Sequence, residues 1–233
     1  MTPTFTHGKN SKVLANGYDV SAWFKSIGGK RAADTAETST IGSSSKSYIG
    51  GLSDGTLTFD GYADGTAAGI STQMNTILGT STVWTYIGAQ DAVGTPGLAA
   101  NAIENDVEIT SDVGAVVTIK GTAQSTTGLE PVLVLHALGA EAAGGSSVQV
   151  DNGASSANGA SSYLQVTGVG TTLTAKTQHS VDGTTWVDLI AHTAVTVANK
   201  AERLTVTGTV NRYLRALWTE TGTATFHLAA CRY

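Results

Sequence analysis

The stretch YLQVTGVGTTLTAKTQHSVDGTTWVDLI, residues 163–190, consists of short apolar and β-branched runs separated by turn residues. Gly168–Thr171 and the pair Asp182-Gly183 mark the two turns. Threonine is β-branched and favours a pleated surface. The stretch therefore predicts three consecutive strands, at Tyr163–Val169, Leu173–His179 and Trp186–Ile190.

The same pattern continues to the last residue of the sequence. It predicts four more strands, at Thr193–Ala198, Arg203–Thr207, Tyr213–Trp218 and Thr225–Cys231. Seven short strands in about 70 residues are typical of a compact β-sandwich or a jelly-roll-like module. We therefore predict an all-β C-terminal domain over residues 163–233.

Residues 1–140 predict a second, mainly β domain. The alternation is clearest around Leu57 and Phe59, where Asp54-Gly55 and Asp60-Gly61 bracket a strand. The candidate strands of this domain are Val13–Trp23, Tyr48–Tyr62, Val83–Ile87, Asn101–Thr110, Val113–Thr122 and Pro131–His136.

One short helix is predicted over residues 66–78 of this domain. Its apolar side chains fall at helical spacing and form one stripe. Asp64 or Thr66 can cap its start, and Gly79 stands where a C-terminal glycine belongs. The stripe is more typical of a face packed on a sheet than of a cofactor site, and it consists of Ile70, Met74, Ile77 and Leu78.

A long polar stretch lies between Lys30 and Lys46, with the sequence KRAADTAETSTIGSSSK. It has a single large apolar residue and cannot form a core of its own. We therefore predict a long loop over residues 30–47, or an arm that becomes ordered only against a partner. The candidate residues of this inter-subunit arm are Lys30, Arg31, Asp34, Glu37, Ile41 and Lys46.

Residues 141–162 are rich in Gly, Ala and Ser, interrupted only by Val148-Gln149-Val150. Such a composition is flexible and buries little apolar surface. It predicts a linker, with a domain boundary near residue 140. The formal net charge of −5 lies entirely in residues 1–140.

Composition excludes several classes of protein. The one cysteine, Cys231, can form neither an internal disulfide nor a Cys-based zinc site. Hydrophobic residues make up 41% and charged residues 13% of the chain, which is unlike an intrinsically disordered protein. A net negative charge argues against a general nucleic-acid binder. No apolar run is long enough to span a membrane, and no secretion signal opens the sequence.

Motifs for catalysis and cofactor binding are absent from the sequence. There is no GxSxG, GxGxxG or GxxxxGK[ST] pattern, and the five histidines lack metal-ligand spacing. Asp54, Asp60 and Asp64 each precede or lie near a glycine, which indicates turns more than calcium binding. We therefore predict no catalytic, cofactor-binding or metal-binding residues and no enzymatic activity.

Glu104, Asp106 and Glu108 alternate in the stretch AIENDVEIT. In a strand, period two would place all three carboxylates on one face. Such a face must meet water or cations, because like charges on neighbouring positions repel. It is either an ordinary solvated sheet face or an acidic surface that lines something.

The segment QHSVDGTTWVDL allows two interpretations. His179, Asp182 and Trp186 could form a sugar-binding patch, with the indole as a stacking platform. Alternatively, the segment is a hairpin with Asp182-Gly183 at its turn and Trp186 in the core. The second interpretation is the simpler one.

Several stretches resemble tail proteins of long-tailed bacteriophages. In the C-terminal part these are TAKTQHSVDGTTWVDL, 174–189, and RLTVTGTVNRYLRALWTETGTATFHLAACRY, 203–233. In the N-terminal part, ANGYDVSAWFKS, 15–26, and KRAADTAETSTIGSSSKSYIGGLSDGTLTFDGY, 30–62, resemble a siphovirus-type major tail (tail tube) protein. The residues that carry this resemblance are structural rather than catalytic.

The resemblance implies a virion structural protein with a tail-tube-like N-terminal β-sandwich and an added C-terminal β-sandwich on the exterior. Such subunits form homo-oligomeric rings, commonly hexameric, which stack into a conduit for DNA ejection. The lumen passes DNA without specific binding, and Glu104, Asp106 and Glu108 are the candidate acidic lumen residues. An acidic lumen would repel phosphates.

The resemblance also implies partners and a location. The expected protein partners are other tail proteins, namely the tape measure, the terminator and the baseplate or tip. The expected location is the virion tail, assembled in the host cytoplasm without a membrane. The alternative function is a decoration or receptor/glycan-binding module that uses the C-terminal sandwich, with Trp186, Tyr213 and Trp218 exposed.

Overall fold

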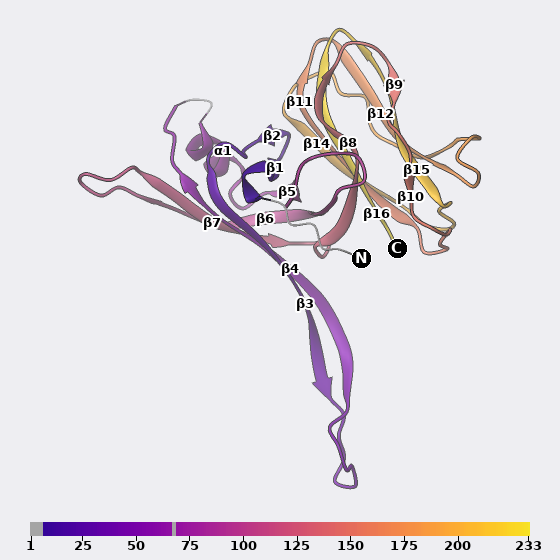
Figure 1. Cartoon of the computed structure of the whole chain (residues 1–233). Coiled ribbons are helices and arrows are strands. Elements are labelled where there is room, and N and C mark those ends of the chain that lie inside the picture. Colours follow the sequence, from indigo (N-terminus) through magenta and orange to yellow (C-terminus); the bar gives the residue numbers. More distant parts are fainter. Residues whose placement is uncertain (1–6, 67–68) are drawn as a thin grey trace. The chain divides into compact units, whose positions relative to one another are not determined.

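The computed structural model describes residues 7–66 and 69–233 (Figure 1). Over these residues the chain is mainly β, with antiparallel strand pairs and one α-helix, as the sequence predicts. It divides into two compact units. Unit 1 comprises Met1–Trp23, Thr82–Ala100 and Glu130–Tyr233, and unit 2 comprises Phe24–Ser81 and Asn101–Leu129.

Unit 1 is a β-sandwich. In one sheet the strand order is β14-β11-β16-β8-β6-β5-β1-β2. These strands are β14 (Lys200–Val206), β11 (Ala160–Val169), β16 (Ala224–Arg232), β8 (Glu130–Glu141), β6 (Pro96–Thr110), β5 (Ser81–Ile87), β1 (Lys12–Ala15) and β2 (Tyr18–Asp19). A short 3-10 helix, Gly8–Asn10, precedes β1.

The second sheet of unit 1 has the order β10-β15-β12-β13, with β9 also paired to β15. The strands are β9 (Gly145–Ser146), β10 (Val150–Asp151), β12 (Thr172–Ser180), β13 (Val187–Ala191) and β15 (Tyr213–Thr221). Burial alternates along β12 and β15, so one face of each strand is apolar. The core between the sheets contains Leu164, Leu173, Leu214, Trp218, Phe226 and Leu228.

Unit 2 is built on a sheet with β4 and β7 at its centre. The strands are β3 (Phe24–Glu37), β4 (Tyr48–Tyr62), β7 (Thr118–Ser125) and the second half of β6. The helix α1 (Ile70–Ile77) buries one apolar face, consisting of Ile70, Met74 and Ile77. These are three of the four residues of the predicted stripe; the fourth, Leu78, is the C-cap of the helix and is exposed. After the helix, the Gly79 N–H donates to the backbone oxygen of Glu104 on β6, at 2.8 Å.

The helix differs from the prediction at its start. Gly69 is the N-cap and makes no side-chain cap bond, so neither Asp64 nor Thr66 fills that position. Asp64 instead accepts the Thr66 N–H and forms a turn before the helix. Residues 67 and 68 of the predicted span lie outside the described residues. Gly79 has a φ of 74° just after the helix, as a C-terminal glycine should.

The prediction of a flexible linker over residues 141–162 is wrong. β9 and β10 lie inside it and both pair with β15, and β11 begins at Ala160. Val150 is buried in the core of the sandwich. β9 and β10 are each two residues long and are held by backbone hydrogen bonds to the distant strand β15, so composition alone does not reveal them.

The predicted domain boundary near residue 140 also differs from the structure. β8 continues through this position and pairs with β16 along its length. The N-terminal strands β1 and β5 belong to the same unit as the C-terminal sandwich. The buried Gln165 joins them: its amide donates to the Val83 oxygen at 3.0 Å and its oxygen accepts the Gly17 N–H at 2.7 Å.

Among the predicted C-terminal strands, Thr193–Ala198 is the exception. It is a loop with a single bridge between Val195 and Leu173. The other six predicted runs correspond to strands, except that Trp186 and Thr207 lie one residue outside β13 and β14. No helix in the described residues is long and apolar enough to cross a membrane.

Candidate functional site

Residues 30–37 of the predicted loop over residues 30–47 belong to strand β3. β3 and β4 pair from Phe24↔Gly61 to Glu37↔Tyr48 and form one long hairpin (Figure 1). Only residues 38–47 at its tip lie outside strands. The sequence predicted a loop because this segment lacks apolar alternation, but backbone hydrogen bonds between two strands do not require it.

Beyond Gly55, the hairpin has only two strands. β7 pairs with β4 from Thr56 to Tyr62 and no further. Both faces of the remaining ribbon are exposed, with burial confined to the end near β7. We call residues 28–55 the arm. A two-stranded ribbon has little stability by itself in water.

The six candidate arm residues all lie on this hairpin or its tip and are exposed. Lys46 and Glu37 form an ion pair, with Nζ and Oε2 3.1 Å apart. An exposed pair of this kind contributes little stability. The arm also exposes Tyr48 and Ile49, which sequence reasoning did not single out, besides Ile41. Leu52, which the sequence suggests as part of the apolar alternation with Leu57 and Phe59, is exposed as well.

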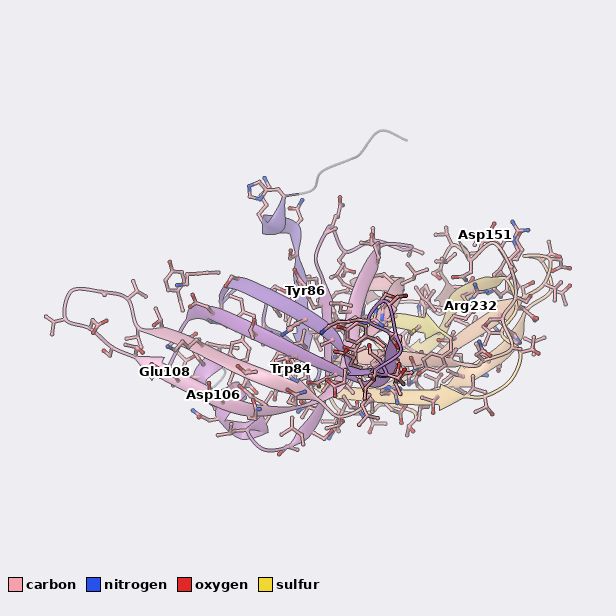
Figure 2. All side chains as sticks on the ribbon, turned by 90° about the horizontal axis from the view of Figure 1, so that it is seen from below. Trp84, Tyr86, Asp106, Glu108, Asp151 and Arg232 are labelled. Atoms are coloured by element: carbon pink, nitrogen blue, oxygen red, sulfur yellow. The ribbon has the colours of Figure 1, made fainter. Side chains whose placement is uncertain are left out.

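The three candidate acidic residues do not share one face, which corrects the prediction. The register between β6 and β7 shifts between Glu104 and Asp106. Glu104 lies opposite the buried Ala123, whereas Asp106 lies opposite Thr122. The extra residue at this bulge turns Glu104 into the interior, where it is fully buried. Asp106 and Glu108 remain exposed (Figure 2).

Asp106 and Glu108 lie on a face that also carries cations. Glu108 Oε2 lies 2.9 Å from Lys120 Nζ on the neighbouring strand. Lys120 lies opposite Asp60 on the next strand, and Asp60 pairs with Lys25 at 3.2 Å. The face is therefore a row of alternating charges rather than a purely acidic surface.

Glu104 is a buried carboxyl group without a hydrogen-bond partner among the described residues, at either oxygen. Burial removes it from water and raises its pKa to about 8. At neutral pH it is therefore protonated. A neutral, fully buried side chain cannot supply negative charge to a lumen.

Unit 1 holds a Ser-His-Glu chain that no sequence motif indicates. Ser162 Oγ and His192 Nε2 are 2.9 Å apart, and His192 Nδ1 and Glu202 Oε2 are 2.9 Å apart. These are the distances of a hydrolase triad. Ser162, however, is fully buried between the sheets, and its hydroxyl also contacts Thr177 Oγ1 at 2.8 Å. A substrate cannot reach it, so the chain is a structural link across the sandwich.

A pocket of about 290 Å³ lies near this chain, at the edge formed by β14 and the loop before it. Its lining includes Leu164, Val195, Lys200 and Glu202, but neither Ser162 nor His192. The Glu202 carboxylate is already occupied by His192 and by the backbone and hydroxyl of Thr193. The pocket therefore does not open the Ser-His-Glu chain to a ligand.

The segment around Asp182 forms the turn that the simpler interpretation predicts. Its carboxylate accepts the N–H groups of Thr184 and Thr185 at 2.9 and 2.8 Å, which holds its pKa well below the usual range. His179 Nδ1 accepts the Asn211 N–H at 3.2 Å. Neither residue is available as part of a sugar patch. Trp186 is neither an exposed platform, as the sugar patch would require, nor a core residue, as the hairpin interpretation predicted. It is half-buried and lies against Arg215.

Trp218 is buried in the core of unit 1, against His136 and Phe226. A binding module that needs Trp218 exposed is therefore inconsistent with the structure. Asp54 and Asp60 are engaged by Gly55 and Lys25. Across the described residues, no group of three His, Cys, Asp or Glu side chains could hold a metal ion.

Comparison with known proteins gives no family. No family model matches the chain, and no curated protein matches it. Among solved structures, a chain of the virion of a native gene transfer agent particle is 11% identical over 54% of this chain and 97% of its own, with a TM-score of 0.44. The SPP1 Dit protein is 11% identical over 96% of this chain and 99% of its own, with a TM-score of 0.41. A chain of the anti-feeding prophage baseplate is 10% identical over 56% and 96%, with a TM-score of 0.44.

Proposed function

We propose that this chain is a virion structural protein of a long-tailed bacteriophage, and specifically the major tail tube subunit. Its copies assemble into stacked sixfold rings around a conduit for DNA ejection. The observation that carries the proposal is the arm, a two-stranded ribbon with both faces exposed. The sequence resemblance supports the same assignment.

The arm is suited to an interface because its exposed groups gain from being covered. Tyr48, Ile49 and Leu52 are at least half exposed. Over most of its length the ribbon has unpaired strand edges, which can accept another strand. In a closed ring or stack these edges and apolar side chains are buried, which removes the aggregation liability that they carry in the free chain.

Of the three candidate acidic lumen residues, only Asp106 and Glu108 remain candidates. Both are exposed on β6, whereas Glu104 is neutral and buried. We propose that DNA passes this face without specific binding, because alternating charges on Lys25, Asp60 and Lys120 offer no basic patch to phosphates. In this proposal the work is done by interfaces and no bond is made or broken.

Negative-stain electron microscopy over a concentration series tests the proposal. The intact chain should form tubes or stacked rings with a central hole. In a shortened variant, an Asn-Gly turn replaces residues 33–53. The turn can be built because Ala32 and Asp54 lie directly opposite each other. This variant should remain monomeric, because it lacks most of the arm. Its circular dichroism should match that of a folded β protein.

Two results would contradict parts of this proposal. Normal tubes from the shortened variant would exclude the arm as the assembly element. Monomers of the intact chain at every concentration would contradict self-assembly and favour the alternative, a decoration or receptor-binding module.

A further inference from the structure

Three arginines of unit 1 lie over aromatic rings. In each pair the guanidinium carbon is within reach of a cation–π interaction with the ring. The pairs are Arg203 over Tyr163 at 5.6 Å, Arg212 over Tyr213 at 4.9 Å and Arg215 over Trp186 at 4.2 Å.

In two of the three pairs the guanidinium also holds a carboxylate of the same chain. Arg203 Nη2 lies 2.5 Å from Glu130 Oε1. Arg212 binds Asp151 in a forked manner, with Nε 2.7 Å from Oδ1 and Nη2 2.6 Å from Oδ2. The recurring arrangement is thus an arginine held on an aromatic face with an acidic group at its edge.

Arg215 also lies over an aromatic ring, but among the described residues its guanidinium binds no carboxylate. Its Nε donates to Gln178 Oε1 at 2.9 Å. The Gln178 amide donates in turn to Asp188 Oδ1 at 2.8 Å, and Lys176 holds the other oxygen of Asp188 at 2.6 Å. Within the described residues, no group hydrogen-bonds to the two Nη nitrogens of Arg215.

The arrangement around Arg215 fixes the guanidinium without neutralising it. Arg215, Gln178 and Asp188 lie directly opposite one another on β15, β12 and β13, so the sheet sets their spacing. Partial burial lowers the pKa of Arg215, which reflects a charge removed from water without a counter-ion. The Asp188 carboxylate, which is linked to Arg215 through Gln178, is already engaged by Lys176 and Gln178.

We propose that Arg215 and Trp186 form a binding site for a carboxylate carried by an acidic saccharide. The two Nη nitrogens of a fixed guanidinium match the two oxygens of a carboxylate. The guanidinium lies over the half-buried indole of Trp186, and the part of the ring that it leaves uncovered is an apolar surface on which a sugar ring can pack.

A saccharide fits this place better than a peptide. Arg215 lies on β15 and Gln178 on β12, which are interior strands of their sheet, so the backbone at Arg215 has no free edge to pair with an extended peptide; the edge strand next to β12 is β13. The neighbouring side chains, Lys176, Gln178 and Asp188, are polar. The pocket lined by Leu164 and Val195 lies at another edge of the unit and offers no apolar anchor to a peptide bound at Arg215.

Isothermal titration calorimetry on the full chain tests the proposal, with a glucuronate-containing tetrasaccharide as probe and its neutral methyl ester as the matched ligand. The acidic probe should bind, the ester should bind at least tenfold more weakly, and added salt should weaken the acidic probe. Arg215→Gln should abolish binding. Arg215→Lys should weaken it about tenfold, because the charge remains while the fork is lost.

Arg212→Gln is the matched control, since Arg212 also lies over an aromatic ring but its fork is filled by Asp151; it should leave binding unchanged. Trp186→Phe should weaken binding while retaining the charge, which keeps the test valid if Arg215→Gln misfolds. Absence of binding, or binding that survives Arg215→Gln in a folded protein, would overturn the proposal. Arg215-dependent binding of a glutamate-rich peptide without binding of the saccharide would overturn the saccharide assignment.

Discussion

At the scale of single residues, Glu104 shows how one register shift changes the chemistry of a side chain. The sequence places it with Asp106 and Glu108, but the bulge between positions 104 and 106 sends it to the opposite face. There it meets no hydrogen-bond donor among the described residues. The Glu104 side chain is therefore a neutral, protonated acid, because burying an ionised carboxylate without a partner would cost several kcal/mol of free energy.

Glu104 should make the stability of the protein depend on pH. Its pKa is about 8 in the folded state, whereas an ordinary glutamate side chain has a pKa of 4.5. Between these values the folded state keeps a proton that the unfolded state releases. Stability therefore falls as pH rises from 4.5 to 8, by at most about 1.4 kcal/mol per pH unit. The free energy of unfolding in urea, measured from pH 4 to 9, tests this. Glu104→Gln should not show the loss of stability between pH 4.5 and 8, and at pH 8 it should be more stable than the parent.

Glu108→Gln is the control for this experiment. Glu108 is exposed and paired with Lys120, which lowers its pKa, so its replacement should not remove the loss of stability between pH 4.5 and 8. An unchanged slope in Glu104→Gln would show that Glu104 does not titrate in this range.

Gly17 is a second residue whose role depends on the tertiary structure. The Asn16-Gly17 pair indicates a turn, and Gly17 indeed has a φ of 80°. A Cβ at this position would lie 2.4 Å from the backbone nitrogen of Lys200. Gly17→Ala should therefore destabilise unit 1 by roughly 3 kcal/mol or more, because strain and a backbone clash add.

Gly208→Ala separates these two causes in thermal or urea unfolding. Gly208 has a φ of 97°, but nothing lies within 4 Å of its added Cβ. It should lose only about 1 kcal/mol, from backbone strain alone. Equal losses for the two variants would argue against the contact between Gly17 and Lys200.

At the scale of elements, the arm formed by β3 and β4 is the feature that the sequence described least well. Its composition indicates a loop, because small and polar residues fill it. The structure pairs these residues across two strands from Phe24↔Gly61 to Glu37↔Tyr48. The prediction that this segment reaches a partner is untested and remains part of the proposed function.

Polar substitutions on the arm should affect assembly without affecting the fold. Ile49→Thr combined with Leu52→Ser changes exposed side chains, so thermal unfolding of the monomer should be unchanged within about 0.5 kcal/mol. Sedimentation velocity should show weaker self-association than for the parent, because the apolar contacts of the interface are lost.

Val148→Ser is the matched control, since Val148 is similarly exposed but lies outside the arm. Equal loss of association in both variants would indicate general surface hydrophobicity as the cause. Unchanged association in the double variant would exclude these two arm side chains from the interface.

At the scale of the whole molecule, the units are discontinuous in sequence. Unit 1 takes its strands from three separate segments, and the sandwich core includes Leu135 of β8 with residues of β11 to β16. The Gln165 side chain ties β11 to the segments around Gly17 and Val83. A C-terminal domain cut at the predicted boundary would thus lose strands and buried partners.

A fragment of residues 141–233 should therefore fail to fold alone. Without β8, the buried β16 strand becomes an exposed edge on one side. Near-ultraviolet circular dichroism and amide exchange should show no fixed packing in this fragment, while the full chain is folded. A fragment with native dispersion and protection would restore the boundary near residue 140.

The sequence by itself determined the local features of this protein. Alternation and turn residues placed six of the seven predicted C-terminal runs in strands, and the stripe of Ile70, Met74 and Ile77 identified the helix. These features depend on side chains within a few positions of one another. The mainly β class follows from them.

Only the tertiary structure decided which strands pair and which side chains they bring together. The strands in the expected linker, the discontinuous units and the bulge at Glu104 all depend on backbone bonds between distant segments. The same holds for Arg215 and Trp186, which are separated in sequence and meet across the sheet. Hydrogen bonding in a sheet is formed by the backbone that all residues share, so composition and local pattern carry little information about the partner.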